Sequence, residues 1–326
     1  MNKISRRDFL KYCSLAAGAL CINLGDLKRL EAALETQKPT VVWLHGSGCQ
    51  GDSVSLLNRF QNSGPAKTID DTLINGINLC YHTVVMTQAG EPAVLSAMKA
   101  RREGSYVLVV EGGIPTRFNG GACSIWTSKD KEITYKDAVL DFAKGTQTIL
   151  AVGTCAAFGG IPKSPPNPTG VMGMEELLVH EGIIGKTLIN ISGCPAHPDW
   201  IVGTIVKLIL GDTVTLDGFN RPTFLYGENV HQECPRREGT PTHQGFATQF
   251  GQDRLCLMDL GCRGPDTFAD CPNRRWNNGV NWCVDANGMC LGCVEPGFPA
   301  GGFYDPGSLN PLNPVRLLRA LTRKNK

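Results

Sequence analysis

The sequence predicts an α/β protein: a flavodoxin-like parallel sheet domain followed by a smaller, irregular domain. Between residues 40 and 210, short apolar runs rich in β-branched residues alternate with helical patterns, as in a parallel sheet covered on both faces. From residue 217 to residue 303 the chain is rich in Gly, Pro, Asn, Arg and Cys and shows no sustained period. Side-chain packing alone does not hold so long an irregular segment, so we expect cross-links or metal centres there.

The expected elements alternate in chain order. Buried strands are predicted at residues 41–45, 79–86, 106–111, 148–152 and 188–192. Helices are predicted at residues 54–60, 91–102, 135–144, 174–181 and 198–210. The expected domains are therefore residues 38–215 for the sheet and residues 216–303 for the irregular part, with a C-terminal tail at 304–326.

The N-terminus carries an export pattern. Residues 5–11 read SRRDFLK, which resembles a twin-arginine signal, and a mildly apolar stretch follows at 12–24. That stretch is too short and too polar to span a bilayer. The alternative is an ordinary basic helix start. We expect residues 1–35 to be a signal peptide and the protein to be periplasmic or otherwise extracytoplasmic. It would be exported folded, with no transmembrane anchor of its own.

Composition narrows the function. Net charge is +2, with 42% hydrophobic and 19% charged residues, so nothing favours nucleic acid as a partner. The chain has 14 cysteines, too many for incidental core thiols and too dilute for a small disulfide scaffold. Half of them lie between Cys234 and Cys293. This clustering indicates a chemical use.

Three cysteines follow predicted strands in glycine-rich turns: Cys49, Cys155 and Cys194. Because the carboxyl ends of parallel strands meet at one edge of a sheet, these thiols can converge there. Neighbouring glycines let backbone N–H groups approach the sulfurs of a metal cluster. The alternative is three buried structural thiols.

The first of these turns also fits a dinucleotide-binding pattern. Residues 46–51 read GSGCQG, a G-x-G-x-x-G between a strand and a helix, and Asp70 and Asp71 follow about twenty residues on. These two carboxylates do not end an apolar second strand, as a ribose contact requires. A nicotinamide-dependent oxidoreductase is therefore a third choice.

The irregular domain holds one histidine and seven cysteines with ligand-like spacing. In chain order they are His231, Cys234, Cys256, Cys262, Cys271, Cys283, Cys290 and Cys293, which is enough for two sets of four ligands. Iron–sulfur clusters take thiolates and, less often, imidazole. Zinc and disulfides use the same residues, so a zinc- or disulfide-stapled extracytoplasmic binding protein without redox function stays an alternative.

Together these motifs resemble the small subunit of nickel–iron hydrogenases, from the signal to about residue 300. The strings that carry the resemblance, in order, are VVWLH at 41–45 with Cys49, EGGIPT at 111–116, GTCAAFGG at 153–160, GCPAHP at 193–198, residues 256–265, and residues 281–296 beginning NWC. Any one of them is modest evidence, but the ordered set is specific.

The resemblance implies an electron-transfer subunit with three iron–sulfur clusters and no catalytic residue of its own. A proximal cluster would use Cys49, Cys155 and Cys194, a medial cluster Cys271, Cys290 and Cys293, and a distal cluster His231, Cys234, Cys256 and Cys262. Many members have proline where Cys283 stands and hold a 3Fe–4S medial cluster. Here Cys283 would supply the fourth ligand, so that all three clusters are 4Fe–4S.

The resemblance also implies the partners. The reversible conversion of H2 to two protons and two electrons would occur at a nickel–iron centre in a separate large subunit. Electrons would pass from the proximal to the medial to the distal cluster. They would then reach an external acceptor, such as a cytochrome or a membrane electron-carrier subunit.

The sequence departs from the family at the proximal site. The family pattern is C-x2-C, but Asp52 stands at the second position. Asp52 could simply cap a helix that begins at Ser53, because Asp is a preferred N-cap. We expect instead that its carboxylate binds the fourth iron, a harder ligand than thiolate. Oxygen-tolerant members with a 4Fe–3S cluster carry extra cysteines where Gly51 and Gly160 stand, so that mechanism is not supported.

Other polar and aromatic residues near the motifs carry weaker signals. We expect His197 to be structural. Arg236 and Arg237 are expected at a solvated surface, with docking of an acidic electron acceptor as the alternative. Trp276 and Trp282 are expected to pack around the clusters.

Overall fold

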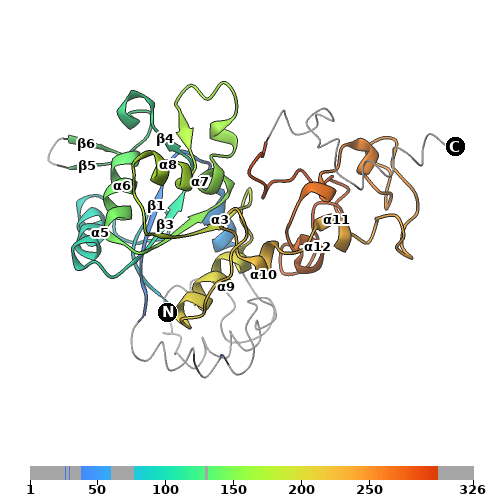
Figure 1. The fold of residues 1–326 in the computed structure, drawn as a ribbon, viewed down its shortest axis with the longest axis horizontal. Coiled ribbons are helices and arrows are strands. Elements are labelled where there is room, and N and C mark those ends of the chain that lie inside the picture. Colours follow the sequence, from blue (N-terminus) through green and yellow to red (C-terminus); the bar gives the residue numbers. More distant parts are fainter. Residues whose placement is uncertain (1–25, 27–28, 30–37, 60–76, 129–130, 300–326) are drawn as a thin grey trace. The chain divides into compact units, whose positions relative to one another are not determined.

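The computed structural model describes residues 38–59, 77–128 and 131–299, together with residues 26 and 29 (Figure 1). Apart from Asp26 and Arg29, the expected signal peptide lies outside the described residues, and so does the expected C-terminal tail. The chain divides into two compact units between Phe224 and Leu225, which we call the N-terminal unit and the C-terminal unit.

The N-terminal unit is built on a five-stranded sheet with the order β2-β1-β3-β7-β9, in which every pair is parallel. The strands are β1 (Thr40–His45), β2 (Asn78–His82), β3 (Val107–Glu111), β7 (Thr148–Val152) and β9 (Thr187–Ile191). Each central strand is a nearly unbroken apolar run, as expected for a strand covered on both faces. The predicted α/β class with a parallel sheet is confirmed.

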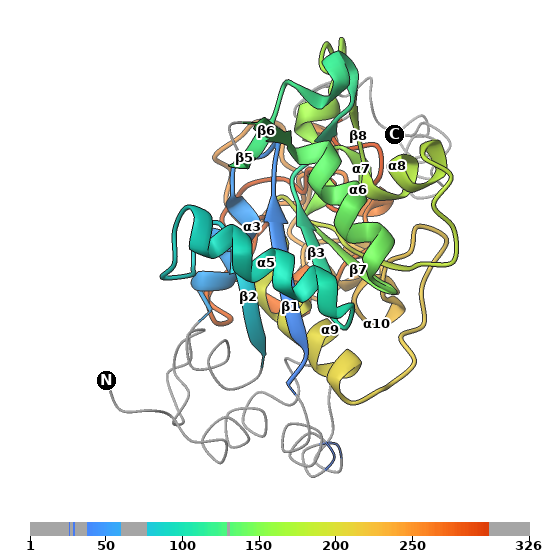
Figure 2. The ribbon, with the colours of Figure 1, turned by 90° about the vertical axis from the view of Figure 1, so that its left-hand side faces the viewer.

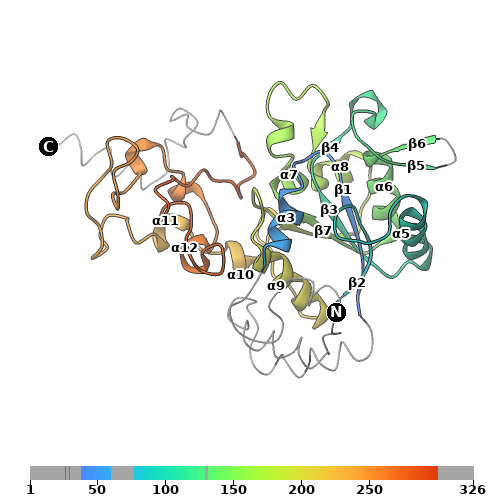
Figure 3. The ribbon, with the colours of Figure 1, turned by 180° about the vertical axis from the view of Figure 1, so that it is seen from behind.

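Helices cover both faces of this sheet. Helices α5 (Glu91–Glu103) and α6 (Tyr135–Gly145) pack on the face to which Val42 and Leu44 contribute, as Figure 2 shows. Alternate residues of a strand point to opposite faces, so Val41 and Trp43 are buried on the other side. There α3 (Gly51–Leu57) and α9 (Pro198–Ile209) lie against each other (Figure 3).

Smaller elements complete the N-terminal unit. They are the pair β4 (Ile114–Pro115) and β8 (Val171–Met172), the hairpin of β5 (Ser124–Ser128) and β6 (Lys131–Thr134), helices α7 (Thr154–Phe158) and α8 (Met174–His180), and the 3-10 turns η1 (Arg117–Gly120) and η2 (Ile161–Lys163). Helix α10 (Thr223–Tyr226) spans the division between the units.

The register of the sheet aligns the strand ends. His45 pairs with Glu111, Glu111 with Val152, and Val152 with Ile191. Four strands therefore stop at the same level. The loops that follow them leave from one edge of the sheet, and these loops carry the predicted proximal ligands.

Two predicted boundaries are wrong for local reasons. The strand predicted at 79–86 ends at His82, because the His82 ring nitrogen Nδ1 accepts hydrogen bonds from the amides of Val84 and Val85 and turns the chain. The helix predicted from residue 54 begins at Gly51, because Gln50 takes a left-handed conformation with φ 59° and ends the preceding turn early.

From Leu225 to Pro299, the described part of the C-terminal unit, the helical elements are short. They are α11 (Val230–Glu233), α12 (Cys271–Arg274), η3 (Met258–Leu260) and η4 (Gly264–Asp266). Ala247, Leu257 and Met289 form a small apolar cluster. The irregular second domain expected from composition is thus seen. Over the described ranges, no helix has the length and apolar character needed to cross a membrane.

Candidate metal centres

The aligned strand ends bring the predicted proximal residues together. Cys49 lies between β1 and α3, directly before Gln50, the N-cap residue of α3. Cys155 is the second residue of α7, and Cys194 lies between β9 and α9. Burial, and next the negative charges of Cys194 and Asp52, raise the pKa of the Cys155 thiol to about 12, and Cys49 contributes as well. The pKa of Cys194 is raised to about 11 by burial and then by Asp52 and Cys49. The four side chains are therefore close electrostatic neighbours.

Asp52 does not cap the helix. The N-cap position belongs to Gln50, and Asp52 is the second residue of α3, so the capping hypothesis is wrong. Its carboxylate is buried, and Oδ1 accepts a hydrogen bond from the Ala196 amide at 2.7 Å. Burial, and next the charge of Glu111, raise the pKa of Asp52 to about 8. Such a group is costly to hold as an anion unless a cation compensates it.

Glu111, at the end of β3, anchors the start of α3. Its Oε1 accepts hydrogen bonds from the backbone amides of Asp52 at 3.1 Å and Ser53 at 3.0 Å. Its Oε2 accepts from Trp43 Nε1 at 2.8 Å and from the Ser53 hydroxyl. Glu111 is not among the site residues predicted from the sequence. The signal that could have found it is an acidic side chain at the end of a buried strand, level with the turns that carry the cysteines.

Glycines keep space open around the proximal thiols. A Cβ on Gly153, which has φ +85°, would lie 2.0 Å from the Asp52 carboxylate. A Cβ on Gly160, with φ +51°, would lie 2.9 Å from Cys155 Sγ. A cluster needs unobstructed approach to each sulfur, so the residues present fit such a group.

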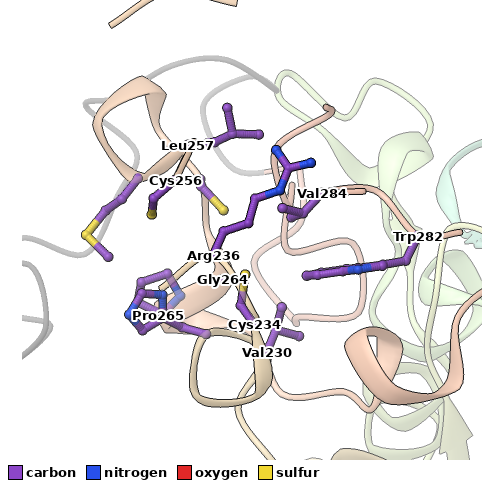
Figure 4. A pocket seen from close by; sticks show the side chains of 12 residues that line it. Val230, Cys234, Arg236, Cys256, Leu257, Gly264, Pro265, Trp282 and Val284 are labelled. Atoms are coloured by element: carbon purple, nitrogen blue, oxygen red, sulfur yellow. The ribbon is translucent and has the colours of Figure 1, made fainter. Parts of the chain in front are cut away.

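The predicted distal residues line one cavity in the C-terminal unit. His231, Cys234, Cys256 and Cys262 all line it. Figure 4 labels Cys234 and Cys256 among the lining side chains. Asn229 fixes the turn that carries the histidine, because its Oδ1 accepts from the His231 amide at 2.9 Å and its Nδ2 donates to the Pro265 carbonyl at 2.9 Å. Burial, and then the charges of Cys256 and Cys234, raise the pKa of Cys262 to about 11.

The predicted medial residues are also neighbours. Burial raises the pKa of Cys271 well above its usual range, and Cys293, Cys290 and Cys283 add to the effect. The medial and distal sets adjoin, because Cys262 contributes to the raised pKa of Cys290 and the Arg263 amide donates to the Cys290 carbonyl at 2.8 Å.

Whether these thiols are free or paired bears on the alternative of a protein stapled by disulfides or zinc. The 12 cysteines within the described ranges are all free, so no disulfide staples this part of the chain. In the same ranges, no group of three or more His, Cys, Asp or Glu side chains is arranged around a single metal ion. A four-iron cluster binds each ligand through a different iron, so its ligands do not meet at one point.

Comparison with known proteins finds a matching protein family for each of the two units. Residues 226–304 match the family described as the C-terminal part of the NiFe/NiFeSe hydrogenase small subunit, and residues 49–208 match the NADH ubiquinone oxidoreductase 20 kDa subunit family. The chain is 38% identical to the periplasmic NiFeSe hydrogenase small subunit of Desulfomicrobium baculatum, over 91% of this chain and 97% of that protein. It is 35% identical to the periplasmic NiFe hydrogenase small subunit 1 of Nitratidesulfovibrio vulgaris, over 90% of each.

The chain belongs to the nickel–iron hydrogenase small-subunit family. Its fold agrees with a solved structure of the Desulfomicrobium baculatum NiFeSe hydrogenase, with a TM-score of 0.75 and 38% identity over 82% of this chain and 99% of the other. The hydrogenase small subunit is part of an oxidoreductase whose catalytic site lies on the large subunit. The family carries iron–sulfur clusters.

Two weaker predictions concern residues beside the ligand sets of this hydrogenase small subunit. His197 is the N-cap residue of α9, where its side chain accepts from the Asp199 amide at 3.1 Å, a structural role as predicted. The prediction that Arg236 is solvated is wrong. It is buried, because its side chain runs along the cavity of the distal set.

Proposed function

We propose that this hydrogenase small subunit relays electrons through three 4Fe–4S clusters, between the nickel–iron site of its large subunit and an external acceptor. The observation that carries the proposal is the distal cavity, which is lined by all four residues of one predicted ligand set. The proximal and medial sets support it, because the thiols of each set, with Asp52 in the proximal one, interact with one another electrostatically. When bound, the clusters supply one-electron transfer.

At the proximal site, Cys49, Asp52, Cys155 and Cys194 would hold the cluster. Asp52 is proposed as the fourth ligand because it is a buried carboxylate among thiols, and its Oδ1 accepts a hydrogen bond from the Ala196 amide. Iron would provide the positive charge that this buried group otherwise lacks. Glu111 holds the backbone of the same turn.

In the C-terminal unit, Cys271, Cys283, Cys290 and Cys293 would hold the medial cluster, and His231, Cys234, Cys256 and Cys262 the distal one. Cys283 makes the medial site a four-thiolate site, which supports 4Fe–4S. Electrons would move from the proximal to the medial to the distal cluster, with His231 at the exit.

The domains and the route of export are also part of the proposal. Residues 1–35 would direct export of the folded protein by the twin-arginine route, 38–215 would carry the proximal cluster, and 216–303 the other two. The relatives' names place them in the periplasm, which supports the same location for this chain. A cytochrome or a membrane electron-carrier subunit would accept the electrons.

The test is anaerobic co-purification of this chain with its large subunit. We expect brown protein with about twelve irons in the small subunit, distributed as three four-iron clusters. Replacement of the distal ligand Cys262 by Ser should lower the iron content or alter the distal signal. The control, Cys123→Ser, changes a thiol that packs against the sheet core and should leave both unchanged. Colourless protein, or protein with zinc in place of iron, would refute the proposal.

A further inference from the structure

The distal cavity holds an indole that is not a ligand. Trp282 lines the cavity with a side chain only 3% exposed. Its Nε1 is buried and has no hydrogen-bond partner in the described part of the chain. In Figure 4 the ring extends from its backbone into the group of side chains around Cys234. A buried N–H without an acceptor is destabilising, so an acceptor inside the cavity would remove that penalty.

The same cavity holds a buried cation. Arg236 is 8% exposed, and its Nη1 donates to the side-chain oxygen of Asn287 at 2.8 Å and to the Leu255 carbonyl at 3.4 Å. Both acceptors are neutral. Asp253, an exposed carboxylate, is hydrogen-bonded to the same Asn287 at 3.1 Å and so lies one side chain farther away.

A buried guanidinium needs a negative counterpart, because transfer of an unpaired charge out of water is expensive. The thiols that line this cavity provide one once they bind iron as thiolates. Arg236 lines the same cavity as Cys234, Cys256 and Cys262. Trp282 and Arg236 therefore line the cavity in which the proposed distal cluster would lie.

We propose that Trp282 and Arg236 raise the reduction potential of the distal cluster, the first as an N–H donor to its sulfur and the second as a buried positive charge. The proposal rests on the proposed function, since it requires a distal cluster. Reduction adds one electron, delivered from the large subunit, and makes the cluster more negative. A nearby cation and an N–H donor both stabilise that reduced state, so the potential rises.

Trp282 is also the sequence neighbour of Cys283, a residue of the medial set. Two consecutive residues would therefore serve two clusters: the Cys283 thiol would bind the medial cluster, and the Trp282 indole N–H would donate to the distal one. A raised distal potential favours the presence of the electron at the exit cluster. Trp282 and Arg236 are thus positioning and tuning residues, which bind no iron themselves.

The test uses the purified heterodimer and an EPR-monitored redox titration. The distal cluster is identified by the nitrogen coupling of its histidine ligand. Trp282→Phe keeps the aromatic packing and removes the N–H, and we expect a lower distal potential. Trp276→Phe is the matched control, because Trp276 does not line the cavity, and it should titrate as the wild type does.

Arg236→Gln should also lower the distal potential, and Arg236→Lys should restore most of it. The control Arg254→Gln removes an exposed arginine charge from the same unit and should change the potential much less. If Arg236→Gln fails to retain iron, the comparison of Trp282→Phe with Trp276→Phe decides. Wild-type protein without a distal signal would refute the proposed function. A wild-type signal with equal potentials in Trp282→Phe and Trp276→Phe would overturn only this inference.

Discussion

The carboxylate of Asp52 accepts a hydrogen bond from the backbone amide of Ala196 at 2.7 Å. These residues are 144 positions apart and belong to two different ligand turns, one at the start of α3 and one before α9. The bond therefore connects the turn of Cys49 with the turn of Cys194. Asp52 thus has a structural role through this bond, and its proposed role as an iron ligand needs a separate test.

Replacement of Asp52 separates these two roles. Asp52→Asn keeps an oxygen that can accept from Ala196 but is a poor iron ligand, whereas Asp52→Ala loses both functions. If Asp52 binds iron, both variants should show an altered proximal EPR spectrum or a three-iron signal. A spectrum of the asparagine variant that matches the wild type would leave Asp52 with the structural role alone.

Glu111→Gln should weaken the start of α3. One amide oxygen cannot replace two carboxylate oxygens that accept from two backbone amides, an indole and a hydroxyl. Loss of charge-assisted hydrogen bonds in a buried site costs about 1.5–3 kcal/mol, so the thermal midpoint should fall. Glu132→Gln changes an exposed glutamate of β6 and serves as the control. Equal midpoints in the two variants would contradict this role.

We expect Cys283 to determine the type of the proposed medial cluster. Cys283→Pro should convert a four-iron site into a three-iron site, which appears as a new signal in EPR spectra of the oxidised protein. The change should leave the proximal signal intact. Cys80→Ser is a suitable control, since Cys80 packs at the edge of the sheet core. Wild-type protein that already gives the three-iron signal would show that Cys283 is not a ligand.

Acid should destabilise the fold through His82. Its Nδ1 accepts from the Val84 amide at 3.0 Å, and burial, followed by the charge of His45, lowers the pKa of His82 to about 3. The unfolded chain takes up a proton near pH 6.5, whereas the folded chain resists it. Stability is therefore full above that pH and is lost as the pH falls toward 3, by at most about 1.4 kcal/mol per pH unit.

The pH effect can be measured as the thermal midpoint between pH 7 and pH 5. His82→Gln removes the titrating group, so the variant should start from a lower midpoint but lose less on acidification than the wild type does. A parallel decline in the two proteins would assign the acid sensitivity to other groups.

The sheet could be predicted because its strands are short apolar runs bounded by glycine, and their ends carry the motif residues. The helix that follows Cys49 begins earlier than predicted, because the left-handed conformation of Gln50 leaves no trace in hydrophobic periodicity. The network of Glu111 could not be predicted either. It depends on which side chains of β1 and α3 meet at the end of β3.

The C-terminal unit presents the opposite case. Spacing and resemblance yield a prediction of its ligand sets, which stays a prediction. Its conformation could not be predicted, because a chain without regular elements has no hydrophobic period. For the same reason, sequence reasoning placed Arg236 in solvent. Its burial follows from the cavity that distant residues such as Cys256 and Trp282 close around it.

The common level at which β1, β3, β7 and β9 end has an evolutionary consequence. The hydrogen-bonded strands fix where each turn leaves the sheet, whereas the turns themselves are only a few residues long and carry the metal chemistry. A single substitution in a turn can then exchange one donor atom for another without disturbance of the strands. Under the proposed function, Asp52 in place of the family's cysteine would be one such exchange, with altered inorganic chemistry on an unchanged protein frame.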